Sequence, residues 1–149
     1  MKKKSLSAAI VLIALITAAA SLVGCADLRR PNPINIYTFR QHAIDNGFEL
    51  SEDQGWTVAY ITGRSHAEVR QFGSVGNART AFDSHARWMD INFGGGSSTE
   101  VNAGHQIYRR RSGNRRASLY RVNDTVFFVY GHTGDDSLIN AFVNAVITR

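Results

Sequence analysis

Apolar residues recur at intervals of three and four positions over two long stretches of the chain, which is the spacing of an amphipathic helix. The first stretch predicts a helix over residues 75–91, with Ser74 capping its first turn. The second begins after Asp135, Asp136 and Ser137, whose side chains suit a helix start, and runs almost to the C-terminus. Two substantial helices are therefore expected, one in the middle of the chain and one at its end.

A shorter helix is predicted near residue 40. Thr38 and Gln41 have the spacing of a capping box, in which each side chain satisfies a backbone N–H of the first turn. Gly47 can end the helix in a left-handed conformation. These signals predict a helix over about residues 39–46.

Five runs rich in β-branched and aromatic residues are predicted as strands. They cover residues 56–62, 66–72, 106–111, 116–122 and 125–131. The last run is apolar on both faces from Phe127 to Tyr130, which places it in the middle of the sheet. The glycine-rich segment 94–98 is predicted as a flexible loop.

The resulting order, α-ββ-α-βββ-α, predicts a single α+β domain over residues 36–149. We expect an antiparallel sheet of about five strands with the helices packed mainly on one face. Eight residues in the apolar phases of these elements are expected to be buried: Trp56, Val58, Phe82, Met89, Leu119, Phe128, Phe142 and Val146.

The N-terminus follows a different pattern. Lysines at positions 2–4 precede an apolar run over residues 8–20 and then Leu22-Val23-Gly24-Cys25, which together match the regions of a secretory signal. The last four residues resemble the lipobox of bacterial lipoproteins, in which the bond before the cysteine is cleaved and its thiol is alkylated by diacylglycerol. The resemblance implies that residues 1–24 are a signal peptide and that Cys25 carries the lipid. An uncleaved membrane anchor is the alternative, because a spanning helix needs about 20 apolar residues.

A lipidated Cys25 would tether the domain to a membrane on its extracytoplasmic side. Acyl chains such as palmitate hold a protein stably when two are attached, whereas one is marginal. Cys25 is the only cysteine, so the mature domain has no disulfide. Residues 25–35 contain both prolines and are predicted as the lipidated end and a semi-rigid tether. Ala26 stands where lipoproteins kept at the inner membrane tend to have Asp, so the outer membrane is favoured if the source is Gram-negative.

The net charge of +5 overstates the basic character of the mature protein. All three lysines lie in the signal, which leaves 14 arginines against 12 acidic residues. A nearly neutral domain gives no support to nucleic-acid binding. Beyond the lipobox, the mature part loosely resembles small uncharacterised envelope lipoproteins, by element order alone.

One charged cluster stands out, at the tip of a predicted hairpin. It consists of Arg109, Arg110, Arg111, Arg115 and Arg116. Because guanidinium groups bind phosphate and carboxylate bidentately, the cluster is a candidate site for anionic lipid, an anionic wall polymer or an acidic envelope protein. The alternative is a solvated tip whose charge prevents edge pairing of the sheet.

Catalytic and metal-binding motifs are weak. The sequence has no Gly-x-Ser-x-Gly motif. Five histidines are scattered without the i, i+4 pairing of a helical zinc site: His42, His66, His85, His105 and His132. His85 lies on the apolar stripe of the long helix and is expected to be a partly buried core residue. We therefore expect neither a cofactor nor a metal ion.

These patterns favour a lipid-anchored envelope protein with a non-enzymatic binding or scaffolding domain. The alternative is a small envelope hydrolase whose site is assembled from dispersed His and Asp residues. A pocket in which two or more such groups converge would favour the enzyme. Scattered, exposed histidines over a filled core would favour the binding module.

Overall fold

The computed structural model describes residues 34–102 and 104–147. The chain divides into two units, Met1–Arg30 and Pro31–Arg149, and the described residues all belong to the second. The predicted signal, Cys25 and most of the predicted tether lie outside them. Ile34 is buried in the core, so the folded domain already includes the end of the predicted tether.

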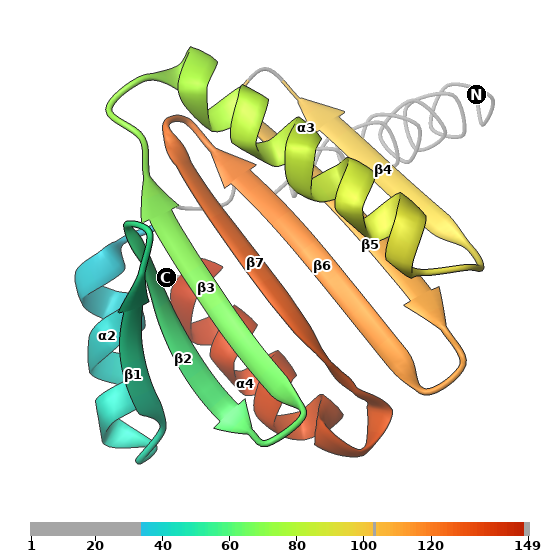
Figure 1. Ribbon diagram of the computed structural model, residues 1–149. Coiled ribbons are helices and arrows are strands. Elements are labelled where there is room, and N and C mark those ends of the chain that lie inside the picture. Colours follow the sequence, from blue (N-terminus) through green and yellow to red (C-terminus); the bar gives the residue numbers. More distant parts are fainter. Residues whose placement is uncertain (1–33, 103, 148–149) are drawn as a thin grey trace, which may run out of the picture. The chain divides into compact units, whose positions relative to one another are not determined.

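Three helices and seven strands make up the described part of the chain (Figure 1). In chain order they are α2 (Ile36–Asp45), β1 (Glu49–Asp53), β2 (Trp56–Thr62), β3 (Ser65–Gln71), α3 (Val75–Asn92), β4 (Ser97–Asn102), β5 (His105–Ser112), β6 (Arg115–Val122), β7 (Thr125–His132) and α4 (Asp136–Ile147), with a short 3-10 turn at Thr133–Asp135 before α4. None of the described helices is long and apolar enough to cross a membrane.

All seven strands pair antiparallel in one sheet with the order β1-β2-β3-β7-β6-β5-β4. The α+β class is confirmed, and so is the central place of β7, whose residues are buried on both faces. The expected number of about five strands was too low. The pairing of β3 with β7 joins the meander β1–β3 to the meander β4–β7.

The two strands missing from the prediction are the two edge strands of the sheet. β1 has the sequence ELSED, with no buried residue, and β4 has the sequence SSTEVN. An edge strand that packs against little else needs no apolar alternation, so its sequence carries a weak signal. The predicted loop 94–98 was wrong at its end, because Ser97 and Ser98 begin β4 and pair with β5.

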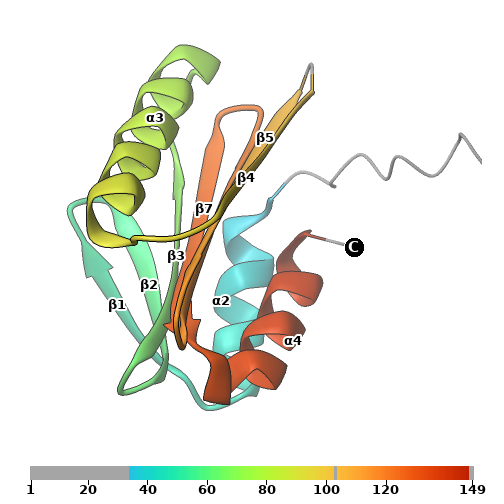
Figure 2. The same cartoon turned by 90° about the vertical axis from the view of Figure 1, so that its right-hand side faces the viewer.

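The helices lie on both faces of the sheet, so the prediction that they pack mainly on one face was wrong (Figure 2). We call the face covered by α2 and α4 the closed face and the face on which α3 lies the open face. Phe127 packs with Phe39 and Phe142 on the closed face, whereas Phe128 belongs to the cluster under α3. A central strand that is apolar on both sides needs cover on both sides.

The helix boundaries follow the capping signals in two of three cases. Ser74 caps α3 as predicted, since its Oγ accepts a hydrogen bond of 3.2 Å from the backbone N–H of Asn77. Gly47 has the expected positive φ of 69° beyond α2. The start of α2 was wrong: Asn35 rather than Thr38 is its cap, accepting from the N–H of Tyr37 at 2.8 Å.

Seven of the eight predicted core residues are buried; Trp56 is half-buried at the margin of the open-face cluster. Both clusters belong to the unit Pro31–Arg149. A unit with its own apolar cores is able to fold without residues 1–30.

Candidate functional site

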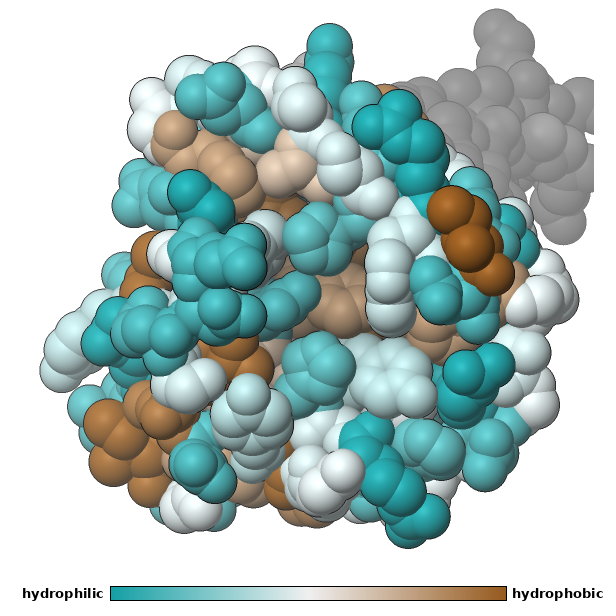
Figure 3. All heavy atoms as spheres, viewed as in Figure 1, coloured by the Kyte–Doolittle hydropathy of each residue, from teal (hydrophilic) through white to brown (hydrophobic). Residues whose placement is uncertain are grey.

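A pocket of about 360 Å³ lies on the open face, between α3 and strands β3 and β7. It is lined by His66, Glu68, Ser84, His85, Trp88 and Phe128. In the space-filling view of this face, apolar surface shows in a hollow beside α3, framed by polar side chains (Figure 3). The volume lies within the range of small-molecule sites, which is about 300–1,000 Å³.

The periodicity of β3 and of α3 explains why their polar residues lie at this pocket. On β3, Ala67 and Val69 are buried in the closed-face core, so the alternating residues His66 and Glu68 lie on the open face. On α3, residues 85 and 88 are three apart and therefore share one flank of the helix. Phe128 is the register partner of Glu68 on β7.

Glu68 and His85 connect the sheet to the helix. The Nε2 atom of His85 lies 3.2 Å from Oε1 of Glu68, and its Nδ1 lies 3.1 Å from the carbonyl oxygen of Ala81. A carbonyl and a carboxylate can only accept, so both contacts are hydrogen bonds when each ring nitrogen of His85 carries a proton, and the pair is then an ion pair. The two side chains remain 25% and 19% exposed, so the pair is accessible from the pocket.

His66 is the second imidazole of the pocket. Burial lowers its pKa below the ordinary value, and the charge of Glu68 opposes this shift in part. Its ring lies 6.1 Å from Phe128 and 5.5 Å from Tyr130 in tilted arrangements. At neutral pH the ring is therefore uncharged and can both donate and accept a hydrogen bond.

Aromatic rings form the rest of the wall. Trp88 stands edge-on to Phe128 with ring centroids 6.0 Å apart, and it remains 46% exposed. Phe128 also contacts the ring of His85 at 5.6 Å. A large apolar ring left half in water beside a pocket is typical of a binding surface.

The predicted arginine hairpin exists, formed by β5 and β6 with Gly113 in the left-handed conformation at the turn. The expectation that five guanidinium groups crowd its tip was wrong. Strand alternation sends Arg110 and Arg115 to the open face and Arg109, Arg111 and Arg116 to the other.

Four of these arginines have partners within the fold. Arg110 pairs with Asp90 and donates to the carbonyl of Gly95 at 2.8 Å. Arg116 lies 2.9 Å from Oδ1 of Asp136 and donates to its backbone carbonyl, and the guanidinium of Arg115 lies 5.2 Å from the ring of Phe93. Arg109 and Arg111 are exposed, and the guanidinium of Arg109 lies 5.6 Å from the ring of Tyr120.

The partners of Asp90 also shift its pKa. The hydroxyl of Tyr108 and the guanidinium of Arg110 donate to its carboxylate and lower its pKa. The pKa of Tyr108 is raised, first by burial and then by Asp90. This cluster joins the end of α3 to β5, so Arg110 has a structural role.

A second set of catalytic residue types meets at the end of the β2–β3 hairpin. The Ser65 hydroxyl donates to Oδ2 of Asp135 at 2.5 Å and accepts from the backbone N–H of His132 at 3.2 Å. The hydroxyls of Ser65 and Thr62 lower the pKa of Asp135. Ser65 is 2% exposed and its proton is directed to a carboxylate instead of an imidazole, so this network ties the hairpin to the start of α4.

The five histidines thus separate. His66 and His85 converge at the pocket, and His132 belongs to the Ser65 network. His42 packs 5.0 Å from the ring of Phe142, and His105 is buried on β5. Within residues 34–102 and 104–147, no group of three or more His, Cys, Asp or Glu side chains is arranged to hold a metal ion.

No protein-family model matches the chain, and no curated protein shows a significant match to it. Among solved structures, a GTP binding regulator from Thermotoga maritima is similar, with 17% identity and a TM-score of 0.46 over 72% of this chain and 84% of that chain. A likeness at this level carries no argument about function.

Proposed function

We propose that the chain is a lipid-anchored envelope protein whose folded domain binds a small ligand in the pocket beside α3. The anchor is supported by the sequence Leu22-Val23-Gly24-Cys25 and by the absence of any other cysteine. The observation that carries the binding role is the convergence of Glu68, His66 and His85 with half-exposed aromatic rings in one pocket.

Binding is favoured over scaffolding because His66, Glu68 and His85, half of the lining residues, are ionisable groups that a purely structural site would not need. Polar groups that converge on an otherwise apolar pocket supply orientation and specificity for a ligand. Glu68 and His85 remain accessible although they are paired, and Trp88 leaves nearly half of its surface in water.

A small hydrolase is the second candidate, because two imidazoles and a carboxylate meet in a pocket. A hydrolase of the serine type needs a hydroxyl within hydrogen-bond reach of an imidazole. The hydroxyl of Ser84 instead donates to the carbonyl of Thr80 at 2.9 Å, one turn back in α3. The enzyme would therefore depend on a water molecule activated by His66 or Glu68.

The anchor is tested by Cys25→Ser in cells. We expect the variant to lose palmitate labelling and to accumulate as the unprocessed precursor, because no other cysteine can be acylated. Unchanged processing and labelling would contradict the anchor.

The binding role is tested with a soluble chain that begins at residue 26. A library of uncharged, cationic and anionic fragments is screened by the backbone amide signals of the isotope-labelled protein. We expect hits to shift signals of residues 66–68, 84–88 and 128. Hits confined to other surfaces would contradict the pocket as the site, and turnover of a hit that Glu68→Gln abolishes would favour the hydrolase.

A further inference from the structure

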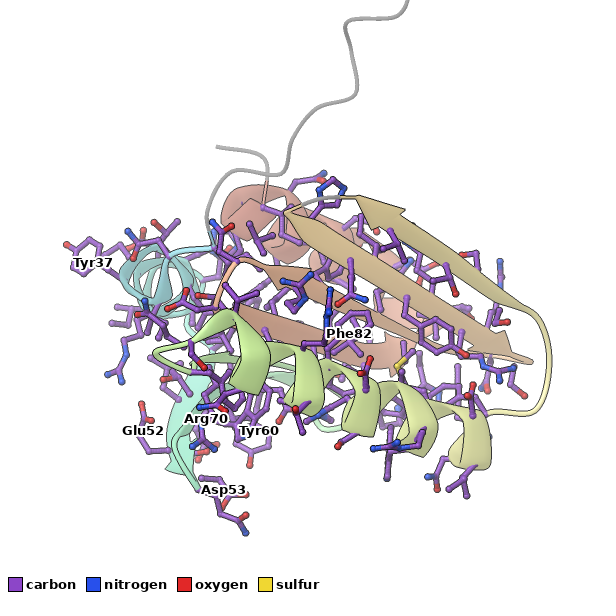
Figure 4. The ribbon with its side chains drawn as sticks, turned by 90° about the horizontal axis from the view of Figure 1, so that it is seen from above. Tyr37, Glu52, Asp53, Tyr60, Arg70 and Phe82 are labelled. Atoms are coloured by element: carbon purple, nitrogen blue, oxygen red, sulfur yellow. The ribbon has the colours of Figure 1, made fainter. Side chains whose placement is uncertain are left out.

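The open face leaves half of the sheet beside α3 without a covering helix in the described part of the chain. α3 packs over β5, β6 and β7, whereas α2 meets β1, β2 and β3 from the closed face. Tyr60 of β2 lies on the same side of the sheet as α3, while Tyr37 lies on the other side with α2 (Figure 4). The pocket therefore borders a part of the sheet that no described helix covers on this face.

Aromatic residues mark the two sides of this surface. Tyr60 is the register partner of His66, which lines the pocket, and it is 46% exposed. Trp88 lies across the pocket on α3 with the same exposed fraction. Cross-strand partners on one face have Cβ atoms about 4.5–5.5 Å apart, so Tyr60 lies directly beside the pocket. A ligand with more than one ring would reach both aromatic residues.

Glu68 and His85 form an ion pair whose charges cancel when the ring of His85 is protonated. Glu68 is the carboxylate of the lining, and its Oε1 faces the imidazole of His85. Within the described residues, Oε2 of Glu68 forms no hydrogen bond and remains able to accept one from a ligand hydroxyl. In that ion pair a ligand cation would meet the protonated ring and a ligand anion would meet the carboxylate, so an uncharged ligand with hydroxyl groups fits best.

The ring geometry separates a sugar from a flat heteroaromatic ligand. A planar base is held best between parallel rings, but Trp88 stands at 89° to Phe128 and His66 is tilted by 56°. A pyranose ring has C–H groups on its faces and hydroxyls around its edge. It can rest on one aromatic ring while its hydroxyls bond to the imidazole and carboxylate groups at the wall.

We infer that the open face binds a neutral oligosaccharide, with one sugar ring in the pocket against Trp88 and the next on Tyr60. This inference rests on the proposed binding function and names the ligand class of the same site. Most glycoside hydrolases use two carboxyl groups at the scissile bond. We infer binding alone, because the pocket lining has one carboxyl group, which is already paired with His85.

The test compares saccharides that differ in charge. The soluble chain from residue 26 is titrated with N-acetylchitotriose, maltotriose and cellotriose, which are neutral, with the deacetylated cation chitotriose and with the anion trigalacturonate. We expect at least one neutral trisaccharide to shift the pocket amide signals and to bind about tenfold or more tightly than either charged sugar.

Matched variants locate the site. Trp88→Ala and Glu68→Gln are expected to weaken binding of the neutral trisaccharide by about tenfold. Tyr60→Ala is expected to weaken binding of the trisaccharide but not of the matching monosaccharide. Ile91→Ala is the control, because Ile91 is 83% exposed on the same helix and does not line the pocket. The amide spectrum of each variant shows whether it is folded.

Each other outcome overturns the inference. A charged sugar that binds more tightly than the neutral ones, or equal binding by the Trp88 and Ile91 variants, contradicts it. If no sugar shifts the pocket signals while other fragments do, the saccharide class is wrong and the binding function stands. If neither sugars nor fragments shift them, both proposals fail.

Discussion

The closed and open faces of the sheet both carry aromatic residues, but these residues are buried on the closed face and partly exposed on the open face. On the closed face, Phe39 lies 4.9 Å from Phe142 and 6.0 Å from Phe127, and all three rings are fully buried. On the open face, Trp88 and Tyr60 each leave nearly half of their surface in water. Aromatic residues hold the fold together on one side and remain available on the other.

Polar groups occur on both faces but differ in their surroundings. The closed-face core is formed by apolar side chains and Tyr120, and polar groups beside it are paired within the fold, as Ser65 is with Asp135 and Arg116 with Asp136. The open face places Glu68 and His85 at the margin of its core, where a pocket keeps them accessible. Buried polar groups reduce stability unless they are hydrogen-bonded, so their retention beside a pocket indicates a role in binding.

The largest test of this contrast compares Phe142→Ala with Trp88→Ala. Phe142 is fully buried between two helices and the sheet, and its truncation should cost about 3–5 kcal/mol of the free energy of unfolding. Trp88 is half-exposed, so its truncation should cost less than about 2 kcal/mol. Urea unfolding of both variants checks this, and equal losses would mean that the two faces do not differ in this way.

The sequence predicted the elements whose apolar positions are periodic. The boundaries of α3 and β2 agree with the prediction almost to the residue, because one face of each packs on a core. β1 and β4 were missed because they are edge strands of polar sequence. The run in β7 that is apolar on both sides requires cover on both faces of the sheet, which is why helices lie on both faces and not mainly on one.

The pocket could not be predicted from local sequence patterns. His66 and Glu68 could be assigned to one wet face of a strand, since they alternate with Ala67 and Val69. Their meeting with His85 depends on the angle at which α3 crosses the sheet, and that angle is set by packing across the whole domain. The predicted crowding of the arginines was wrong for the opposite reason. Strand alternation places sequence neighbours on opposite faces of the sheet, so closeness along the chain did not mean closeness of the guanidinium groups.

A smaller effect is expected at the arginine hairpin. Arg116→Gln removes the ion pair with Asp136, which is partly exposed, and should lower stability by about 1 kcal/mol. The double variant Arg109→Gln, Arg111→Gln alters exposed side chains and should leave the urea midpoint unchanged.

The same variants test an anionic partner. If the hairpin contacts anionic lipid, the double variant should reduce binding to anionic vesicles in low salt, since each arginine near such a surface contributes about 1 kcal/mol. Neutral vesicles and high salt are the controls. Equal binding by the wild type and the double variant would leave the hairpin with a structural role only.

The smallest expected effect is a pH dependence of stability that originates at His66. Burial lowers the pKa of this imidazole in the folded protein, so the unfolded chain takes up the proton more readily. Stability should therefore fall as the pH decreases from the ordinary histidine pKa of about 6.5 through the lowered value, and change no further below it. The groups around the ring are Glu68 on its own strand, Tyr130 and Phe128 on β7, Tyr60 on β2, and His85 across the pocket on α3.

His66→Phe removes this titration while keeping a ring against Phe128 and Tyr130. Urea midpoints of the wild type and the variant are compared between about pH 7.5 and pH 5, where histidines titrate. The other histidines are present in both proteins, so the difference between the two curves isolates His66. The wild type should lose more stability than the variant on acidification, because only the wild type must hold an uncharged imidazole against protonation. Parallel curves would show that the pocket solvates this imidazole as well as water does, and the open face would then be wetter than its aromatic lining indicates.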